Sequence, residues 1–122
     1  MANILVVDDD TSTRTIFKMI IEDETKHQCD MAEDGVHGYE TATNGVDYDL
    51  IFVDVRMPRM NGIELIAKLR ELPKYKNIPI YVISSTLDSA KNTDAEKAGA
   101  TAGIQKPVSA VRILNLVEQA FE

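Results

Sequence analysis

Short apolar runs alternate with segments of helical periodicity along the whole chain. The strand-like runs are short enough for buried strands, and they cover 3–7, 27–31, 50–53, 78–83 and 102–105. A segment with helical spacing of apolar residues follows each of them, at 12–22, 36–43, 63–71, 87–98 and 109–121. Five strand–helix units with short connections predict an α/β domain with a parallel sheet and helices on both faces.

Polar residues and glycines mark the ends of several predicted helices. Ser12 or Thr13 is a candidate N-cap for the first helix, and Ser109 is the expected cap of the last. Asn44-Gly45 is a turn signal that ends the second helix. The segment 87–98 has only a thin apolar face, so we expect a weakly packed helix there.

Composition favours one soluble globular domain spanning 1–122. Apolar residues make up 44% and charged residues 27% of the 122 residues, and the formal net charge is −7. That acidity argues against direct nucleic-acid binding, which needs a basic face. The single Cys29 cannot form an internal disulfide. We see no membrane span and no leader at the start MANILVVD, and we expect a cytoplasmic location.

Chemically active side chains follow four of the predicted strands. In an open parallel sheet the ligand site lies beyond the carboxyl ends of the strands. The candidates at those ends are Asp8, Asp9, Asp10, Asp54, Ser84, Ser85 and Lys106. Each residue alone is more often a helix cap or a loop residue, but their convergence on one sheet edge indicates a site.

This set of groups suits a cation and a phosphoryl group. Crowded carboxylates such as Asp8, Asp9 and Asp54 either hold a proton or bind a cation. Mg²⁺ prefers such hard oxygen ligands and commonly binds through one or two carboxylates plus a phosphate oxygen. With Mg²⁺ and an ammonium present, a carboxylate oxygen can carry a phosphoryl group.

Five motifs resemble the receiver domain of two-component response regulators, of the chemotaxis-regulator type. They are VVDDDTSTR at 6–14, AEDG at 32–35, DVRMPRMNG at 54–62, ISS at 83–85 and GATAGIQKP at 99–107. The resemblance covers essentially the whole chain in order and spacing. It implies a flavodoxin-like (βα)5 fold, a doubly wound parallel sheet of five strands in the order 2-1-3-4-5.

The resemblance also implies roles for the residues that match the motifs. Asp54 would be the phosphoacceptor for a sensor histidine kinase or a phosphotransfer protein. Asp8 and Asp9 would hold Mg²⁺ together with Asp54, with Asp9 the more direct ligand, and the backbone carbonyl of Arg56 would complete the protein's share. Asp10, just outside the pair, is interpreted as a solvated residue or a local cap.

The hydroxyl and the lysine complete the implied site. Ser84 would bond a phosphoryl oxygen, and Lys106 would contact the phosphoryl group, with Lys106-Pro107 resembling the family's cis peptide. Arg56 and Thr86 would overhang the site and tune phosphoryl lifetime. Gly103 departs from the family pattern, which usually has Tyr or Phe three residues before the lysine.

The resemblance implies a signalling module that acts through protein contact rather than an enzyme. We expect a downstream protein target on a face that includes 87–106, and a monomer or a weak activation-dependent dimer. Two readings stay open: a truncated N-terminal receiver of a longer regulator, and an interaction module without phosphorylation. A phosphatase of the aspartate type would need a second acid where Arg56 stands, and DDDTSTR is too acidic to cradle a flavin phosphate unaided.

Overall fold

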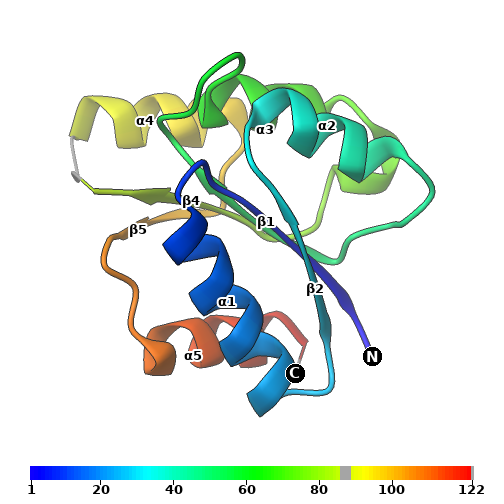
Figure 1. The fold of residues 1–122 in the computed structure, drawn as a ribbon. Helices are drawn as coiled ribbons and strands as arrows, with labels where there is room; N and C mark the ends of the chain where they lie inside the picture. Colours follow the sequence, from blue (N-terminus) through cyan, green and yellow to red (C-terminus); the bar gives the residue numbers. More distant parts are fainter. Residues whose placement is uncertain (86–88, 122) are drawn as a thin grey trace.

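The protein forms a five-stranded parallel sheet between two layers of helices (Figure 1). This computed structural model describes residues 1–85 and 89–121, with 89–93 described by backbone alone. The strands are β1 (Asn3–Val7), β2 (Gln28–Ala32), β3 (Leu50–Asp54), β4 (Ile80–Ser84) and β5 (Ala102–Gln105). The helices are α1 (Thr11–Glu24), α2 (Gly35–Thr43), α3 (Gly62–Arg70), α4 (Ser89–Ala98) and α5 (Ala110–Phe121), with a 3₁₀ turn η1 at Pro73–Tyr75.

The strand order is β2-β1-β3-β4-β5, and every neighbouring pair is parallel. This order confirms the doubly wound arrangement implied by the family resemblance. Figure 1 shows α1 and α5 on one face of the sheet and α2, α3 and α4 on the other. The predicted helices on both faces are therefore confirmed.

Alternation along the central strands divides the core into two apolar clusters. In β1, Leu5 and Val7 face the α2–α4 layer, while Ile4 and Val6 face the α1–α5 layer. All four are fully buried, so β1 is apolar on both sides. Two covered faces leave the strand ends as the place where polar groups can reach solvent.

All ten predicted strands and helices exist, with small shifts at their ends. For the cap of α1, the candidates Ser12 and Thr13 were wrong, and the interpretation of Asp10 as a local cap is confirmed. Asp10 is the N-cap, and its side chain accepts a hydrogen bond from the Ser12 amide at 3.1 Å. Ser12 and Thr13 lie in the first turn and donate to Asp10 instead. Ser109 does cap α5, accepting from the Arg112 amide. Of the predicted helix 87–98, residues 87 and 88 lie outside the described residues.

Parallel register brings the carboxyl ends of the strands to one edge. Val7 of β1 pairs with Val53, and Ser84 at the end of β4 pairs with Gln105. The residues that follow these positions therefore emerge side by side. In the described part of the chain, no helix has the length and apolar character needed to span a bilayer.

At the opposite edge, a buried tyrosine joins three separate segments. Tyr75 in η1 is fully buried, and its hydroxyl donates to the Ala42 carbonyl at the end of α2, 2.6 Å away. The same oxygen accepts from the Tyr48 amide at 3.3 Å. This one hydroxyl satisfies backbone groups that have no route to water.

We predict that Tyr75→Phe destabilises the protein by about 1–3 kcal/mol, because it leaves the Ala42 carbonyl and the Tyr48 amide unsatisfied in the core. Urea unfolding followed by circular dichroism measures the loss. Tyr39→Phe is the control, since that half-buried ring makes no hydroxyl hydrogen bond to any residue the structure describes. Equal stability of the two variants would contradict the assigned role of the Tyr75 hydroxyl.

Candidate functional site

Three aspartates from two neighbouring strands meet beyond the carboxyl end of the sheet. Asp8 and Asp9 follow β1, and Asp54 is the last residue of β3. One carboxylate oxygen of each lies within 4.8 Å of the others. Asp8 is completely buried and Asp54 is 6% exposed, whereas Asp9 is open to solvent. The cluster is therefore a desolvated pair of acids with one exposed acid at its mouth.

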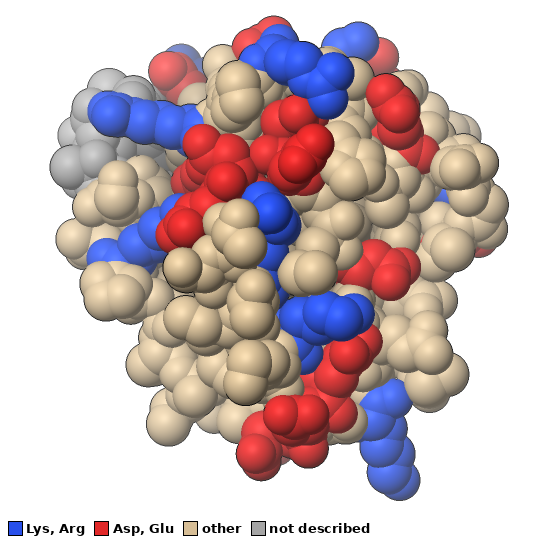
Figure 2. All heavy atoms as spheres, in the orientation of Figure 1, with Lys and Arg blue, Asp and Glu red and all other residues tan. Residues whose placement is uncertain are grey.

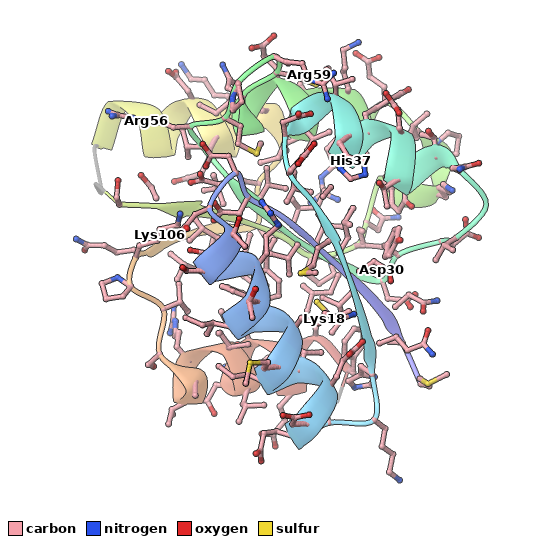
Figure 3. The ribbon with its side chains drawn as sticks, viewed as in Figure 1. Lys18, Asp30, His37, Arg56, Arg59 and Lys106 are labelled. Carbon is pink, nitrogen blue, oxygen red and sulfur yellow. The ribbon has the colours of Figure 1, made fainter. Side chains whose placement is uncertain are left out.

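Lys106, directly after β5, supplies the cationic partner of this cluster. Its Nζ lies 2.9 Å from Asp8 Oδ2 and 3.6 Å from Asp54 Oδ1. Its backbone amide donates to the Ser84 carbonyl at 2.7 Å, which extends the β4–β5 ladder by one bond. The peptide bond to Pro107 is cis, as the resemblance implied. Figure 3 shows Lys106 reaching the site from the β5 side, with Arg56 near α4.

Burial and crowding shift the protonation of both ends of this ion pair. Burial, and then the neighbouring charges of Asp8 and Asp9, raise the pKa of Asp54 to about 7, against the smaller opposing effect of Lys106. Burial alone would lower the pKa of Lys106, but its contacts with Asp8 and Asp54 outweigh it and hold that pKa above the ordinary value. The ammonium stays charged while one carboxyl retains a proton near neutrality.

The residues present fit a divalent cation. When all three acids are ionised, they and the Lys106 ammonium leave two negative charges uncompensated in this small space. Asp8 Oδ1 accepts from the Asp10 amide, but the buried Oδ2 accepts no hydrogen bond within the described ranges and contacts only the Lys106 ammonium. Space-filling atoms show acidic side chains gathered above the start of α1, with basic ones beside them (Figure 2). Carboxylate oxygens with a partly open coordination sphere are a suitable Mg²⁺ ligand set.

The remaining predicted residues lie around this cluster. Ser84 is half-buried at the end of β4, the strand next to β3. Arg56 is exposed two residues after Asp54, and it lines a shallow depression together with Asp9. Gly103 is half-buried in β5 opposite Val82. The predicted overhang of Thr86 lies outside the described residues.

Sequence reasoning missed one ion pair close to the site. Asp34 is 5% exposed, and its Oδ2 accepts two hydrogen bonds from Arg59, from Nε at 3.0 Å and from Nη2 at 2.8 Å. Asp34 also caps α2, accepting from the His37 amide at 2.8 Å. Its place directly before a predicted helix was a signal for the cap, but no spacing rule links it to an arginine 25 positions later.

Comparisons with known proteins agree with this geometry. A sequence model of the response regulator receiver domain matches residues 4–118. The chain is 35% identical over 104 residues to the chemotaxis protein CheY homolog of Campylobacter jejuni, covering 85% of this chain and 80% of that protein. It is 29% identical over 119 residues to chemotaxis protein CheY-3 of Vibrio cholerae, covering 98% of this chain and 91% of that protein.

Solved structures give the same assignment. Chemotaxis protein CheY4 of Vibrio cholerae superposes with a TM-score of 0.92 at 28% identity, covering 99% of both chains. The CheX–CheY–BeF3–Mg²⁺ complex from Borrelia burgdorferi contains a neighbour with a TM-score of 0.88 at 28% identity, covering 99% of this chain and 90% of that one. The predicted fold and the chemotaxis-regulator type are thereby confirmed. The chain belongs to the response regulator receiver domain family.

Proposed function

We propose that this receiver takes a phosphoryl group from a sensor histidine kinase or a phosphotransfer protein onto Asp54. The observation that carries the proposal is the position of the Asp54 carboxylate, which is nearly buried beside two other acids and 3.6 Å from the Lys106 ammonium. A phosphoryl group brings negative charge to this carboxylate. Its transfer therefore requires positive charge close by to neutralise it.

The proposed reaction is an exchange of one bond to phosphorus for another. An oxygen of Asp54 attacks the phosphorus of a phosphohistidine, and the bond from phosphorus to the ring nitrogen breaks. The imidazole leaves with the electron pair and takes up a proton, while Asp54 becomes an acyl phosphate. Lys106, already 2.9 Å from Asp8, is close enough to turn its charge toward the incoming oxygens. Ser84, at the end of the adjacent strand, would donate its hydroxyl to one of them.

Mg²⁺ would be held by Asp8, Asp9 and Asp54, with the backbone carbonyl of Arg56 as a further ligand. The ion would supply the positive charge that offsets both the carboxylate excess and the phosphoryl oxygens. Asp54 with a pKa of about 7 is partly neutral at physiological pH and hence a weak nucleophile. A nearby divalent charge lowers that pKa, so binding of the cation would also increase the fraction of Asp54 that is ionised and able to attack.

The chain's part in signalling follows from the same site. It modifies its own aspartate rather than turning over a separate substrate, so we infer a cytoplasmic signalling module of residues 1–122 and not an enzyme. The phosphorylated form would contact a downstream protein through a face that includes 87–106, as a monomer or a weak dimer. In the neighbour from Borrelia burgdorferi, CheY is found with CheX, BeF3 and Mg²⁺, which supports a protein target.

We expect acetyl phosphate with Mg²⁺ to add a single phosphoryl group, because the small donor needs only the positioned Asp54 and its neutralising charges. Intact-mass spectrometry measures the adduct. Asp54→Asn should abolish it. Lys106→Met should reduce it at least about tenfold by removing the ammonium that contacts Asp8 and Asp54. Asp47→Asn, at an exposed position before β3, should leave it unchanged. An adduct that persists in Asp54→Asn would overturn the assignment of the phosphoacceptor.

We predict a pH-dependent stability difference between the metal-free wild-type protein and Asp54→Asn. The folded-state pKa of Asp54, about 7, lies above the ordinary value of 3.8, so folding holds this proton more tightly and the wild-type protein loses stability as pH rises from about 4 to 7. Asp54→Asn removes the loss, and its advantage should grow to the order of 2 kcal/mol by pH 8. Urea unfolding in EDTA measures it, and Mg²⁺ should restore wild-type stability. A difference independent of pH would contradict the raised pKa.

Beryllofluoride with Mg²⁺ should shift the amide signals of 84–98 and 100–106 in ¹H–¹⁵N spectra, since Lys106 and Ser84 bracket the proposed output face. Signals of β2, at the far edge of the sheet, serve as the control. If only the residues flanking Asp54 moved, the proposed route to the partner through this face would be wrong.

A further inference from the structure

In the described part of the chain, one residue other than glycine has a positive φ, and it lies in the loop between β3 and α3. This residue is Arg59, with φ of 68°. The Met60 amide donates to the Pro58 carbonyl at 2.8 Å, so Arg59 is the central residue of a tight turn closed across three residues. Turns of this kind with a positive central φ are rare and strained, and they persist only where their surroundings hold them.

Asp34 is the group that holds this turn. Both hydrogen bonds from the Arg59 guanidinium end on Asp34 Oδ2, while Oδ1 is occupied by the His37 amide. Burial would raise the pKa of Asp34, but the His37 hydrogen bond and the Arg59 charge outweigh it and keep that pKa below the ordinary value. Figure 3 shows Arg59 beside the first turns of α2, where His37 lies.

The loop and the start of α2 are also in direct contact. A Cβ on Gly35 would lie 2.2 Å from the Met60 carbonyl oxygen, so the two backbones leave no room for a side chain. On the other side, the Gly62 amide donates to the Val55 carbonyl at 2.9 Å and closes the loop onto the end of β3. The segment 55–61 is thus fixed at both ends and clamped at its middle by Asp34.

We propose that the Asp34–Arg59 ion pair is a positioning pair for the cation site. It would hold the loop in which Arg56, two residues after Asp54, lines the same depression as Asp9, so that the Arg56 carbonyl can serve as a ligand. The inference rests on the proposed function, because it concerns the Mg²⁺ site formed by the acidic cluster. Neither Asp34 nor Arg59 touches that cluster. They act through the loop, in the way that outer partners orient metal ligands elsewhere.

Calorimetric titration with Mg²⁺ at constant ionic strength tests the pair through two substitutions of opposite charge. Asp34→Asn keeps an N-cap residue on α2 but removes the anion. Arg59→Gly removes the cation and also relieves the strained φ, so its fold should remain stable. We expect each to weaken Mg²⁺ binding about tenfold, the double variant to be no weaker than the worse single one, and Arg59→Lys to restore part of the loss.

Charge alone predicts a different pattern. Removing the Arg59 cation would then strengthen Mg²⁺ binding, and removing the Asp34 anion would weaken it. That opposite pair of signs, unchanged affinity in both variants, or additive losses in the double variant would each overturn the proposal. Asp47→Asn with Lys74→Gly deletes an ion pair of similar length (2.8 Å) between the loop before β3 and η1, and this control should leave binding unchanged.

Failure of this proposal is distinguishable from failure of the site itself. If the wild-type protein bound Mg²⁺ and the variants bound it equally, the positioning role would be wrong while the cation site stood. If the wild-type protein did not bind Mg²⁺, both would be overturned. Amide spectra of 55–61 in the metal-free variants give a second readout, in which broadened signals for both Asp34→Asn and Arg59→Gly are expected and unchanged signals would count against the clamp.

Discussion

The structure depends on an unbalanced charge at the carboxyl end of its sheet. The side chains of Asp8, Asp54 and Lys106 are wholly or largely buried close to one another, and the pKa values of both Asp54 and Lys106 lie above their ordinary values. One ammonium cannot neutralise three acids, and the buried Oδ2 of Asp8 depends on that ammonium, 2.9 Å away, for its partner. Such a site favours retention of a proton or binding of a divalent cation, and a cation held there would also offset the charge of an incoming phosphoryl group.

The fold can sustain this imbalance because apolar packing fixes the strand ends. The central strands β1 and β3 are apolar and buried on both faces. Asp8 is the first residue after β1, and Asp54 is the last residue of β3. The backbone at Gly62 also packs tightly against the end of β3, because a Cβ on Gly62 would lie 2.1 Å from the Asp54 carbonyl oxygen. The polar site cannot relax by spreading its acids apart without moving backbone that the core holds in place.

The sequence was sufficient for the elements and for the members of the acidic cluster, because both follow from local patterns. Buried strands read as apolar runs, and parallel topology sends every strand end to the same edge, so Asp8, Asp54 and Lys106 could be grouped in advance. Caps were less predictable: Asp10, Ser12 and Thr13 can all serve, and only the backbone geometry selects Asp10. The Asp34–Arg59 pair was beyond reach, since it joins two loops whose meeting depends on how α2 packs against the segment after β3.

Gly103 limits how a change at Asp54 can travel outward. A receiver with an aromatic side chain at this position can turn that ring, but here β5 has no side chain opposite Val82. In the described part of the chain, one link between the ends of β4 and β5 is the hydrogen bond from the Lys106 amide to the Ser84 carbonyl. A phosphoryl group on Asp54 would compete with Asp8 for the Lys106 ammonium. Any shift of Lys106 would then act on its backbone hydrogen bond to Ser84 and so on the end of β4. Residues 81–84 of β4 and 102–105 of β5 would then respond together, because the β4–β5 ladder pairs them at four successive positions.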